Sequence, residues 1–510
     1  MANERLFAKV TAPDLSGNSQ GILVTSQRGS VMMNELKPYP AYKDSGVPWL
    51  GEVPEHWDVR RLKYVLRECD TRSSDGNEQL LRVSQYTGVT QRKRFDGGDE
   101  PDTRAQSLVG YKCVCPDELV VNIMLAWNGS MGVSKFFGIA SPAYCVYRFG
   151  DIAVPWYLHY LLRSPVYMAR IKAVSTGVIE SRLRLYTDDL FRLEALVPPL
   201  SEQAAIARFI NHADRRISRF IRTKLKLIKL LEEQKQAIIH RAVTRGLDPN
   251  VRLKPSGVEW LGDVPEHWEV LPVKRVLHRL IDCEHKTAPV ADGESEYRVV
   301  RTTGVRNGHL KWKGTYCTTQ AAFKEWTKRG LPEPGDVIFT REAPAGEACV
   351  VPESQSICLG QRTVLLKLKL EEYDSQFLIY MIYTGPPRNI IRLATQGSTV
   401  GHFNMDDIAR MTVLKPCLSE QREIVNYIDE ETRGLSMAMA QADQKIALIR
   451  EYRTRLIADV VTGKLDVREA AARLPVETVE PELVDEVESL CEGDEEVVDD
   501  LEAITEEVEV

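Results

Sequence analysis

The chain contains the same opening segment twice. Residues 45–59 have the sequence SGVPWLGEVPEHWDV, and residues 256–270 have the sequence SGVEWLGDVPEHWEV, 211 positions later. A second match, Leu-Ser-Glu-Gln, begins at Leu200 and again at Leu418, and each copy leads into a long helix-like stretch. A repeat of about 215 residues is far longer than the unit of a solenoid, which has roughly 20 to 50 residues. The sequence therefore predicts a duplicated domain that can present two similar surfaces to one two-part target.

Weaker matches carry the repeat through both halves. Leu158 and Tyr160 correspond to Leu378 and Tyr380, 220 positions later, while the residues between such matches differ almost completely. A shared scaffold with divergent loops is typical of domains that recognise different targets. We predict an α+β fold in which two similar α/β domains are separated by two long antiparallel helices that form a coiled coil, with a pseudo-two-fold arrangement. The predicted parts are a disordered leader (1–35), a first domain (36–198), a first helix (199–247), a second domain (248–416), a second helix (417–468) and an acidic disordered tail (475–510).

Local patterns predict several elements of the first domain. Strand-like apolar runs occur at residues 80–84, 119–123 and 144–149, and residues 156–173 carry apolar side chains at helical spacing. Prolines in the repeated opening segment exclude a regular helix there. We expect this segment to be a loop that packs Trp49 and Trp57 on the domain.

The two helical segments carry matching apolar stripes with alternating spacings of four and three residues. Such a pattern, sustained over several heptads, is typical of coiled coils. We predict that the stripes pack on each other, although each helix could instead pack on its own domain. The predicted helix–helix seam consists of Ile217, Ile221, Ile228, Leu231, Ile238, Leu435, Met439, Ile446, Ile449 and Leu456. At about 1.5 Å per residue the stripe at residues 217–242 spans roughly 39 Å, close to one turn of B-DNA at roughly 34–36 Å.

The charge of the chain is unevenly distributed. The chain has 66 Lys and Arg against 73 Asp and Glu, but residues 475–510 hold 16 of the acidic residues and no basic one. The remainder is therefore basic, which favours a polyanionic partner such as nucleic acid. An ordinary charged surface beside a disordered tail is the alternative. The first helix is the more basic one, with 11 basic and 4 acidic residues at 201–245 against 7 and 8 at 419–465, so we expect it to face DNA phosphates unless this face is merely solvated.

Sequence signatures of membrane proteins, metal sites and enzymes are missing. The ten cysteines have no metal-ligand spacing, which favours free thiols in a reducing cytoplasm, and no apolar run has the length of a membrane span. There is no P-loop, no GxGxxG and no Asn-Pro-Pro-aromatic motif, so no catalytic site and no metal site is predicted. His56 and His267, in the repeated segments, are expected to be structural. The acid pairs at 188–189 and 406–407 are expected at helix N-termini.

The order of these features resembles the specificity subunit of type I restriction-modification systems. Each variable domain is introduced by SGVxWLGxVPEHWxV and followed by PxLSEQ and a long helix, within residues 36–470. The resemblance implies a subunit without catalytic activity of its own. Each target recognition domain would bind one half of a bipartite, asymmetric site in double-stranded DNA. The helices would set the spacer between the halves and dock two modification (methyltransferase) subunits that methylate adenine.

The resemblance also implies partners and cofactors outside this chain. S-adenosylmethionine would be used by the modification subunits. Restriction (translocase-nuclease) subunits would use ATP and Mg to translocate and cleave unmethylated DNA, as a phage defence. No cofactor is expected on this chain. Two other function classes remain as alternatives: a self-sufficient restriction enzyme, which would need a catalytic motif, and a scaffold whose domains bind proteins instead of DNA.

Candidate DNA contacts lie in loops or at strand ends between the repeated matches. Arg and Gln in such positions can make bidentate contacts to guanine and adenine, although a solvated surface residue is the alternative for each. The candidates in the first domain are Gln85, Tyr86, Arg92, Lys93, Arg94, Asn128, Arg182 and Arg184. The candidates in the second domain are Lys286, Arg301, Thr302, Arg306, Asn307, Arg341, Gln361, Arg362, His402 and Asn404. Gly177 and Gly397 are expected either to let the backbone approach a phosphate closely or to form simple turns.

Overall fold

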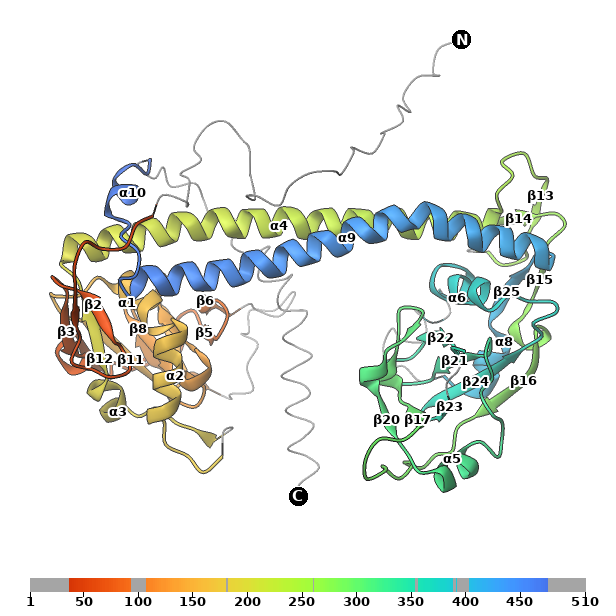
Figure 1. Cartoon of the computed structure of the whole chain (residues 1–510), viewed down its shortest axis with the longest axis horizontal. Helices are drawn as coiled ribbons and strands as arrows, with labels where there is room; N and C mark the ends of the chain where they lie inside the picture. The colour runs from red at the N-terminus through yellow and green to blue at the C-terminus, as the bar shows by residue number, and fades with distance from the viewer. Residues whose placement is uncertain are drawn as a thin grey trace, which may run out of the picture. The chain divides into compact units, whose positions relative to one another are not determined.

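The chain divides into two compact units. The computed structural model describes residues 36–92, 107–179, 182–259, 261–353, 356–388, 391 and 403–475 (Figure 1). Unit 1 comprises Met1–Ser218 and Ile449–Val510, and unit 2 comprises Arg219–Leu448. The boundary between the units falls inside both long helices, so each unit contains one globular domain and a portion of each helix. The predicted leader and almost all of the predicted tail lie outside the described residues.

The long helices are α4 (Leu200–Arg245) and α9 (Leu418–Val461). The least exposed side chains of each helix recur three and four positions apart, which places them on one face. Of the predicted seam residues, Ile217, Ile446 and Leu456 are buried. The others are partly buried: Ile221, Ile228, Leu231, Ile238, Leu435, Met439 and Ile449.

Within unit 1 the two helices pack side by side in opposite directions. Ile210 near the beginning of α4 and Val460 near the end of α9 belong to the same apolar core. Arg453 Nε on α9 donates a hydrogen bond to Asp214 on α4 at 2.5 Å. Arg208, earlier on α4, donates to a carbonyl in α10 (Arg468–Ala472), which follows α9. Because a step forward along α4 corresponds to a step backward along α9, the helices are antiparallel in this unit.

The domain of unit 1 is built on an antiparallel sheet of four strands, in the order β4-β11-β8-β9. These strands are β4 (Leu66–Cys69), β11 (Tyr144–Phe149), β8 (Leu119–Asn122) and β9 (Met131–Val133). The paired strands around them are β1 (Tyr42–Asp44) with β2 (Glu52–Pro54), β3 (Asp58–Arg61) with β12 (Glu194–Val197), β5 (Leu81–Ser84) with β6 (Gly88–Gln91), and β7 (Lys112–Val114) with β10 (Gly138–Ala140). The helices are α1 (Pro155–Leu162), α2 (Pro165–Val174) and α3 (Thr187–Arg192), with a short 3-10 helix η3 (Ala126–Asn128).

The domain of unit 2 has a central antiparallel sheet of the same form, in the order β16-β24-β21-β22. These strands are β16 (Leu277–Asp282), β24 (Thr363–Leu368), β21 (Val337–Thr340) and β22 (Ala348–Val350). The other strands are β13 (Leu253–Pro255), β14 (Asp263–Pro265), β15 (Glu269–Pro272), β17 (Tyr297–Val300), β18 (Val305–Arg306), β19 (His309–Leu310), β20 (Thr315–Cys317), β23 (Ser356–Leu359) and β25 (Thr412–Lys415). The helices are α5 (Gln320–Trp326), α6 (Ser375–Thr384) and α8 (Met405–Arg410), with the 3-10 helices η6 (Thr302–Gly304) and η7 (Trp312–Gly314).

The two domains share a frame and differ around it. In each, an early strand pairs with the strand that precedes the long helix, β3 with β12 and β15 with β25. Around this frame, β5 and β6 form a hairpin in the first domain, whereas β17 in the second pairs with both β20 and β23. The mixture of helices and strands confirms the predicted α+β class. The strands predicted at 80–84, 119–123 and 144–149 correspond to β5, β8 and β11.

The structure differs from the prediction of one helix at residues 156–173. Helix α1 ends at Leu162 and α2 begins at Pro165, because Ser164 has an extended backbone with φ −71° and ψ 150°. Proline fixes its own φ and disfavours a helical backbone at the residue before it. The helical spacing of apolar residues continues across the break and therefore does not reveal it. Pro165 is the residue of the sequence that indicates where the helix is interrupted.

Candidate nucleic-acid interface

The repeated sequence motifs meet at one buried carboxylate in unit 1. Glu202 lies in the first turn of α4, where the helix dipole favours an acidic side chain. Trp57 Nε1 and the Tyr39 hydroxyl donate hydrogen bonds to its Oε1 at 2.9 and 2.7 Å, and His56 Nε2 lies 2.7 Å from Oε2. Gly463, just after α9, packs against the Trp57 ring. The opening segment is thereby joined to the beginning of one long helix and the end of the other.

Unit 2 repeats this junction. Trp268 Nε1 donates to Glu420 Oε1 at 3.0 Å, and His267 Nε2 lies 2.9 Å from Oε2. Gly246, just after α4, packs against the Trp268 ring. The side chain of Glu420 is 23% exposed, whereas that of Glu202 is 4% exposed. Trp260, the counterpart of Trp49 in the repeat, lies outside the described residues.

The glutamine after each glutamate fixes the long helix to its domain. Gln203 Nε2 donates to two carbonyl oxygens of the first domain at 2.9 and 2.7 Å, and its Oε1 accepts from an amide at 2.8 Å. Gln421 makes the corresponding three bonds at 3.0, 2.9 and 2.8 Å. The repeated residues therefore hold the scaffold together, which leaves the residues that differ between the domains for target recognition.

The candidates in the first domain lie on three loops. Gln85 and Tyr86 form the turn of the β5–β6 hairpin, where Tyr86 is 60% exposed, and the exposed Arg92 follows β6. Asn128 ends η3, and its Oδ1 accepts hydrogen bonds from the Ser130 amide and hydroxyl at 3.2 and 2.9 Å. The amide side chain of Asn128 is thus engaged in its own turn. Lys93 and Arg94 lie outside the described residues.

The third loop is a hairpin closed by a bridge between Thr176 and Arg184. Arg182 and Arg184 are both exposed there. A Cβ on Gly177 would lie 2.6 Å from the carbonyl oxygen of Arg182. The two backbone segments are therefore too close for any residue other than glycine at this position. Gly397 lies outside the described residues.

In the second domain, several candidates gather near Asp282. Arg341 Nη1 lies 3.1 Å from both carboxylate oxygens of Asp282, and Arg341 Nε donates to the Phe403 carbonyl at 2.8 Å. The Arg341 side chain is only 12% exposed. Asn404 caps α8, where its Oδ1 accepts from the Asp407 amide at 2.9 Å. Both side chains already serve the internal structure of the domain.

Other candidates lie at the surface beside this cluster. Gln361 Nε2 donates to the His285 carbonyl at 3.4 Å, and Lys286, the next residue along, is exposed. Arg362 is exposed and lies 3.2 Å from Glu342. His402 lies outside the described residues.

The remaining candidates in the second domain surround η6. Arg301 is exposed, with its guanidinium 5.5 Å from the centre of the Tyr316 ring. Thr302 is buried, and its carbonyl oxygen accepts from Arg306 Nη1 at 2.7 Å. Asn307 is exposed, with a left-handed backbone (φ 51°) at the turn between β18 and β19.

One basic and aromatic surface was missed by the sequence reasoning. Trp312 is 42% exposed, and Lys311 and Lys313 on either side of it are exposed. The Arg298 guanidinium lies 5.7 Å from the centre of the Trp312 ring. Cations interleaved with an exposed aromatic ring are common on nucleic-acid-binding surfaces. The signal was visible as the tripeptide Lys-Trp-Lys.

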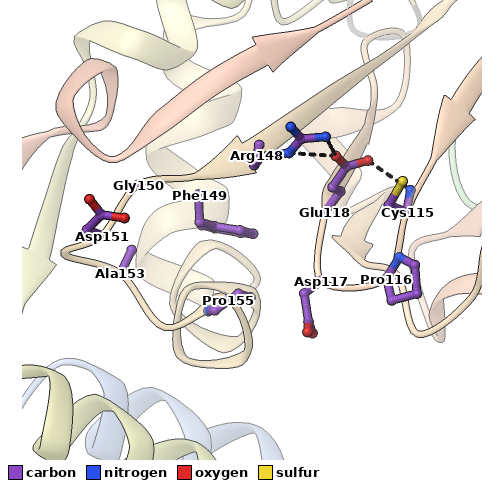
Figure 2. A pocket seen from close by; sticks show the side chains of 10 residues that line it. All are labelled: Cys115, Pro116, Asp117, Glu118, Arg148, Phe149, Gly150, Asp151, Ala153 and Pro155. Atoms are coloured by element: carbon purple, nitrogen blue, oxygen red, sulfur yellow. Dashed lines mark hydrogen bonds and ion pairs between the residues drawn. The ribbon is translucent and has the colours of Figure 1, made fainter. Parts of the chain in front are cut away.

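A hollow in the first domain has a structural origin (Figure 2). Figure 2 shows Arg148 and Cys115 directed at Glu118, whose Oε1 lies 2.7 Å from Arg148 Nη2 and whose Oε2 accepts from the Cys115 amide at 2.8 Å. The equivalent acid in the second domain, Asp336, likewise lies 3.0 Å from Lys367 Nζ and accepts from a nearby amide at 2.9 Å. Because the arrangement recurs, we interpret the hollow as a repeated strand-start motif, not a ligand site.

The described residues offer neither a cluster of metal ligands nor a membrane-spanning helix. Among them, no group of three or more His, Cys, Asp or Glu side chains is arranged to hold a metal ion. No helix formed by them has the length and apolar character needed to cross a membrane.

Comparison with known proteins confirms the resemblance found from the sequence. The chain is 20% identical over 444 residues to a protein of Methanocaldococcus jannaschii whose name assigns it as the MjaX specificity subunit of a type I restriction enzyme, covering 82% of this chain and 96% of that protein. It is 21% identical over 432 residues to the type I restriction enzyme MjaVIII specificity subunit of the same organism, covering 82% and 94%.

A solved structure supports the likeness in fold. A chain from a structure of a type I restriction-modification system, studied for its complex assembly and conformational transition, has a TM-score of 0.57 at 16% identity. The match covers 81% of this chain and 99% of that chain. A scan against models of protein families finds no match.

Proposed function

We propose that this chain is the specificity subunit of a type I restriction-modification system and binds double-stranded DNA in a sequence-specific way. The observation that carries the proposal is the likeness to two type I specificity subunits over 82% of this chain and nearly their whole length. The proposal assigns no catalytic activity and no bound cofactor to the chain itself. Under this proposal, the chain acts in the cytoplasm as part of a larger complex.

Each domain binds one half of a bipartite DNA site under this proposal. The shared central sheet with different surrounding strands supports it, because a common frame can carry loops that contact different bases. Exposed basic residues on those loops, such as Arg92, Arg182 and Arg301, supply the positive charge that phosphate contacts require.

The long helices set the spacer between the half-sites and dock two modification subunits. Those subunits bring S-adenosylmethionine and methylate adenine in each half-site. Restriction subunits join the complex and use ATP and Mg to translocate and cleave unmethylated DNA. The coiled-coil stripe and the antiparallel packing within unit 1 support the role of the helices as a spacer.

Mapping methylated adenines in the genome of cells that express this chain with its modification subunit tests the proposal. We expect methylation at one bipartite sequence with a spacer of constant length. The purified chain alone, given DNA, Mg, ATP and S-adenosylmethionine, should neither cleave nor methylate. Activity of the lone chain would favour a self-sufficient enzyme, and a complex without salt-dependent, sequence-selective DNA binding would favour a protein scaffold.

Exchange of the first domain tests whether the domains act independently. Replacing residues 60–197 by the corresponding residues of a relative with another target should change one half of the methylated sequence and leave the other half and the spacer unchanged. The reciprocal exchange of the second domain serves as the matched control. A change in both half-sites after a single exchange would contradict independent recognition.

A further inference from the structure

One short helix in each domain is anchored to a long helix by a tyrosine. In unit 1, the Tyr160 hydroxyl on α1 donates to Asn211 Oδ1 on α4 at 2.6 Å. In unit 2, the Tyr380 hydroxyl on α6 donates to Asp429 on α9. The two tyrosines are equivalent in the sequence repeat, so α1 and α6 are fixed to the long helices in the same way.

The side chain that follows α1 reaches the loops with the candidate DNA contacts. Arg163 Nη2 donates to the carbonyl oxygens of Gln85 and Tyr86 at 2.8 and 3.1 Å. Arg163 Nη1 donates to the carbonyl oxygens of Gly129 and Met131 at 2.8 and 2.5 Å. One guanidinium therefore holds the turn of the β5–β6 hairpin and the segment after Asn128 in one fixed arrangement.

The environment of Arg163 is unusual for a cation. Within the described part of the chain it pairs with no carboxylate, and its partners are backbone carbonyls. Burial, together with the nearby charge of Arg453, lowers the pKa of Arg163 to about 10, so the side chain remains charged at neutral pH. Its terminal N–H groups are committed to the loops, which leaves them unsuited to contact phosphate. Lysine has three donors on a single nitrogen and cannot reproduce this planar fork.

A different side chain occupies the equivalent position in the second domain. Tyr383, three residues after Tyr380, donates from its hydroxyl to Glu347 Oε2 at 2.6 Å. The same carboxylate oxygen accepts from the Asn307 amide at 2.7 Å. Tyr383 thus supports the β18–β19 turn through Glu347, just as Arg163 supports the β5–β6 turn directly.

We propose that Arg163 and Tyr383 are positioning residues for sequence recognition, each fixing the recognition loop of its own domain against a helix anchored on the long helices. This inference rests on the proposed function and adds residues that contact no base themselves. A loop held in its binding conformation before the encounter discriminates more sharply, because less of the interaction energy is spent on ordering it. The two positions carry different chemistry, so each loop is set independently of the other.

The test compares Arg163→Lys and Tyr383→Phe in the complete complex with the modification subunit. Binding is measured by competition between the cognate duplex and duplexes with single base-pair changes in either half-site, at two salt concentrations. We expect each variant to lose about tenfold in discrimination at one half-site, the two variants affecting different halves. The salt dependence of binding should match that of the wild type, since neither side chain is placed to contact phosphate.

Arg192→Lys is the matched control, because Arg192 is an exposed arginine on α3 of the same domain as Arg163. It should bind as the wild type does. Thermal unfolding of each variant shows whether its fold persists, and Tyr383→Phe, which keeps the ring, provides the test if Arg163→Lys fails to fold. Full discrimination in a folded variant, or equal loss at both half-sites, would overturn the inference. A wild-type complex without any sequence selectivity would overturn the proposed function instead.

Discussion

Glu202 and Glu420 occupy equivalent positions in the repeat but have different surroundings. Glu202 accepts hydrogen bonds from Tyr39 and Trp57 and contacts a histidine, whereas the partners of Glu420 among the described residues are the tryptophan and the histidine. Glu202 is also the more buried of the two. Removal of a buried charged acceptor leaves its donors unsatisfied, at roughly 1–3 kcal/mol for each lost partner.

We therefore expect Glu202→Ala to lower the free energy of unfolding by about 3 kcal/mol and Glu420→Ala by about 1–2 kcal/mol. Urea denaturation followed by tryptophan fluorescence measures both, since Trp57 and Trp268 are the affected reporters. Glu423→Ala, at an exposed position of α9, is the control and should change stability little. Equal losses for Glu202→Ala and Glu420→Ala would contradict the difference in environment.

His159 links stability to pH. Its Nδ1 accepts a hydrogen bond from the Val133 amide at 3.0 Å, which requires this nitrogen to be unprotonated. Burial first, and then the positive charges of Arg163, Lys135 and Arg453, hold the pKa of His159 well below its usual value. The unfolded chain binds this proton at about pH 6.5, before the folded chain does, so protonation favours unfolding.

The contribution of His159 is thus fully present above about pH 6.5 and is lost as the pH falls below it. We expect the melting temperature of the wild type to drop more steeply between about pH 6.5 and 5 than that of His159→Gln, which keeps an acceptor but cannot titrate. Melting curves at half-unit pH intervals make this comparison. Parallel pH profiles for the two proteins would show that His159 does not titrate in the proposed way.

At the scale of elements, each of the two long helices is followed by a glycine with a left-handed backbone. Gly246 follows α4 and Gly463 follows α9, each with a left-handed backbone (φ 71° and 79°) that non-glycine residues disfavour by roughly 1 kcal/mol. A Cβ on Gly463 would lie 2.4 Å from Pro54 Cδ, whereas one on Gly246 would meet Trp268 at 3.3 Å. The two glycines therefore differ in the space around them.

We expect Gly463→Ala to destabilise more than Gly246→Ala, by more than about 2 kcal/mol against about 1 kcal/mol, because strain from the clash adds to strain from the backbone. Gly434→Ala is the control. This glycine lies inside α9, and no described atom outside the neighbouring turns of the helix lies within 4 Å of the position of an added Cβ. Alanine should therefore stabilise the helix by about 0.5–1 kcal/mol. Thermal unfolding of the three variants gives the ranking, and destabilisation by Gly434→Ala would contradict it.

The sequence predicted elements better than contacts. Heptad spacing and strand-like runs revealed the long helices and β5, β8 and β11, because periodicity records which face of an element is buried. The break between α1 and α2 depended on Pro165 alone. Individual candidate DNA contacts were harder to predict, because a polar side chain can either bind a ligand or make hydrogen bonds within the fold.

Asn404 illustrates the difficulty, because the same amide that could contact adenine caps α8 instead. The spacing of Asn404 and Asp407 is a capping signature that the sequence already displayed. Arg163 carried no such signal. Its partners are backbone carbonyls, which every residue has, and its counterpart in the repeat is Tyr383, so the repeat did not mark the position.

For the whole molecule, both boundaries between the two units fall inside the long helices, not between a domain and a helix. Each long helix contributes to both units. Unit 1 combines two segments that are far apart in the sequence, whereas unit 2 is one continuous segment between them. Under the proposed function, the length of the helices is therefore the quantity that sets the spacing of two independent recognition surfaces, while the domains set what each surface recognises.

Removal of one heptad from both helices tests that division of roles. Residues 224–230 of α4 and 437–443 of α9 are the segments to delete, chosen by continuing the register of the Asp214–Arg453 contact. Seven residues correspond to about 10 Å of helix, or about three base pairs, and deletion of a whole heptad keeps the apolar stripes in phase.

Methylation mapping of the shortened complex should show the same two half-sites with a shorter spacer. Affinity should also fall, because about three base pairs rotate one half-site around the duplex by roughly 100° and the DNA must twist to restore the alignment. Deletion from α4 alone is the control and should abolish selective binding, since it breaks the register between the helices. An unchanged spacer in the doubly shortened protein would mean that the helices do not measure the distance.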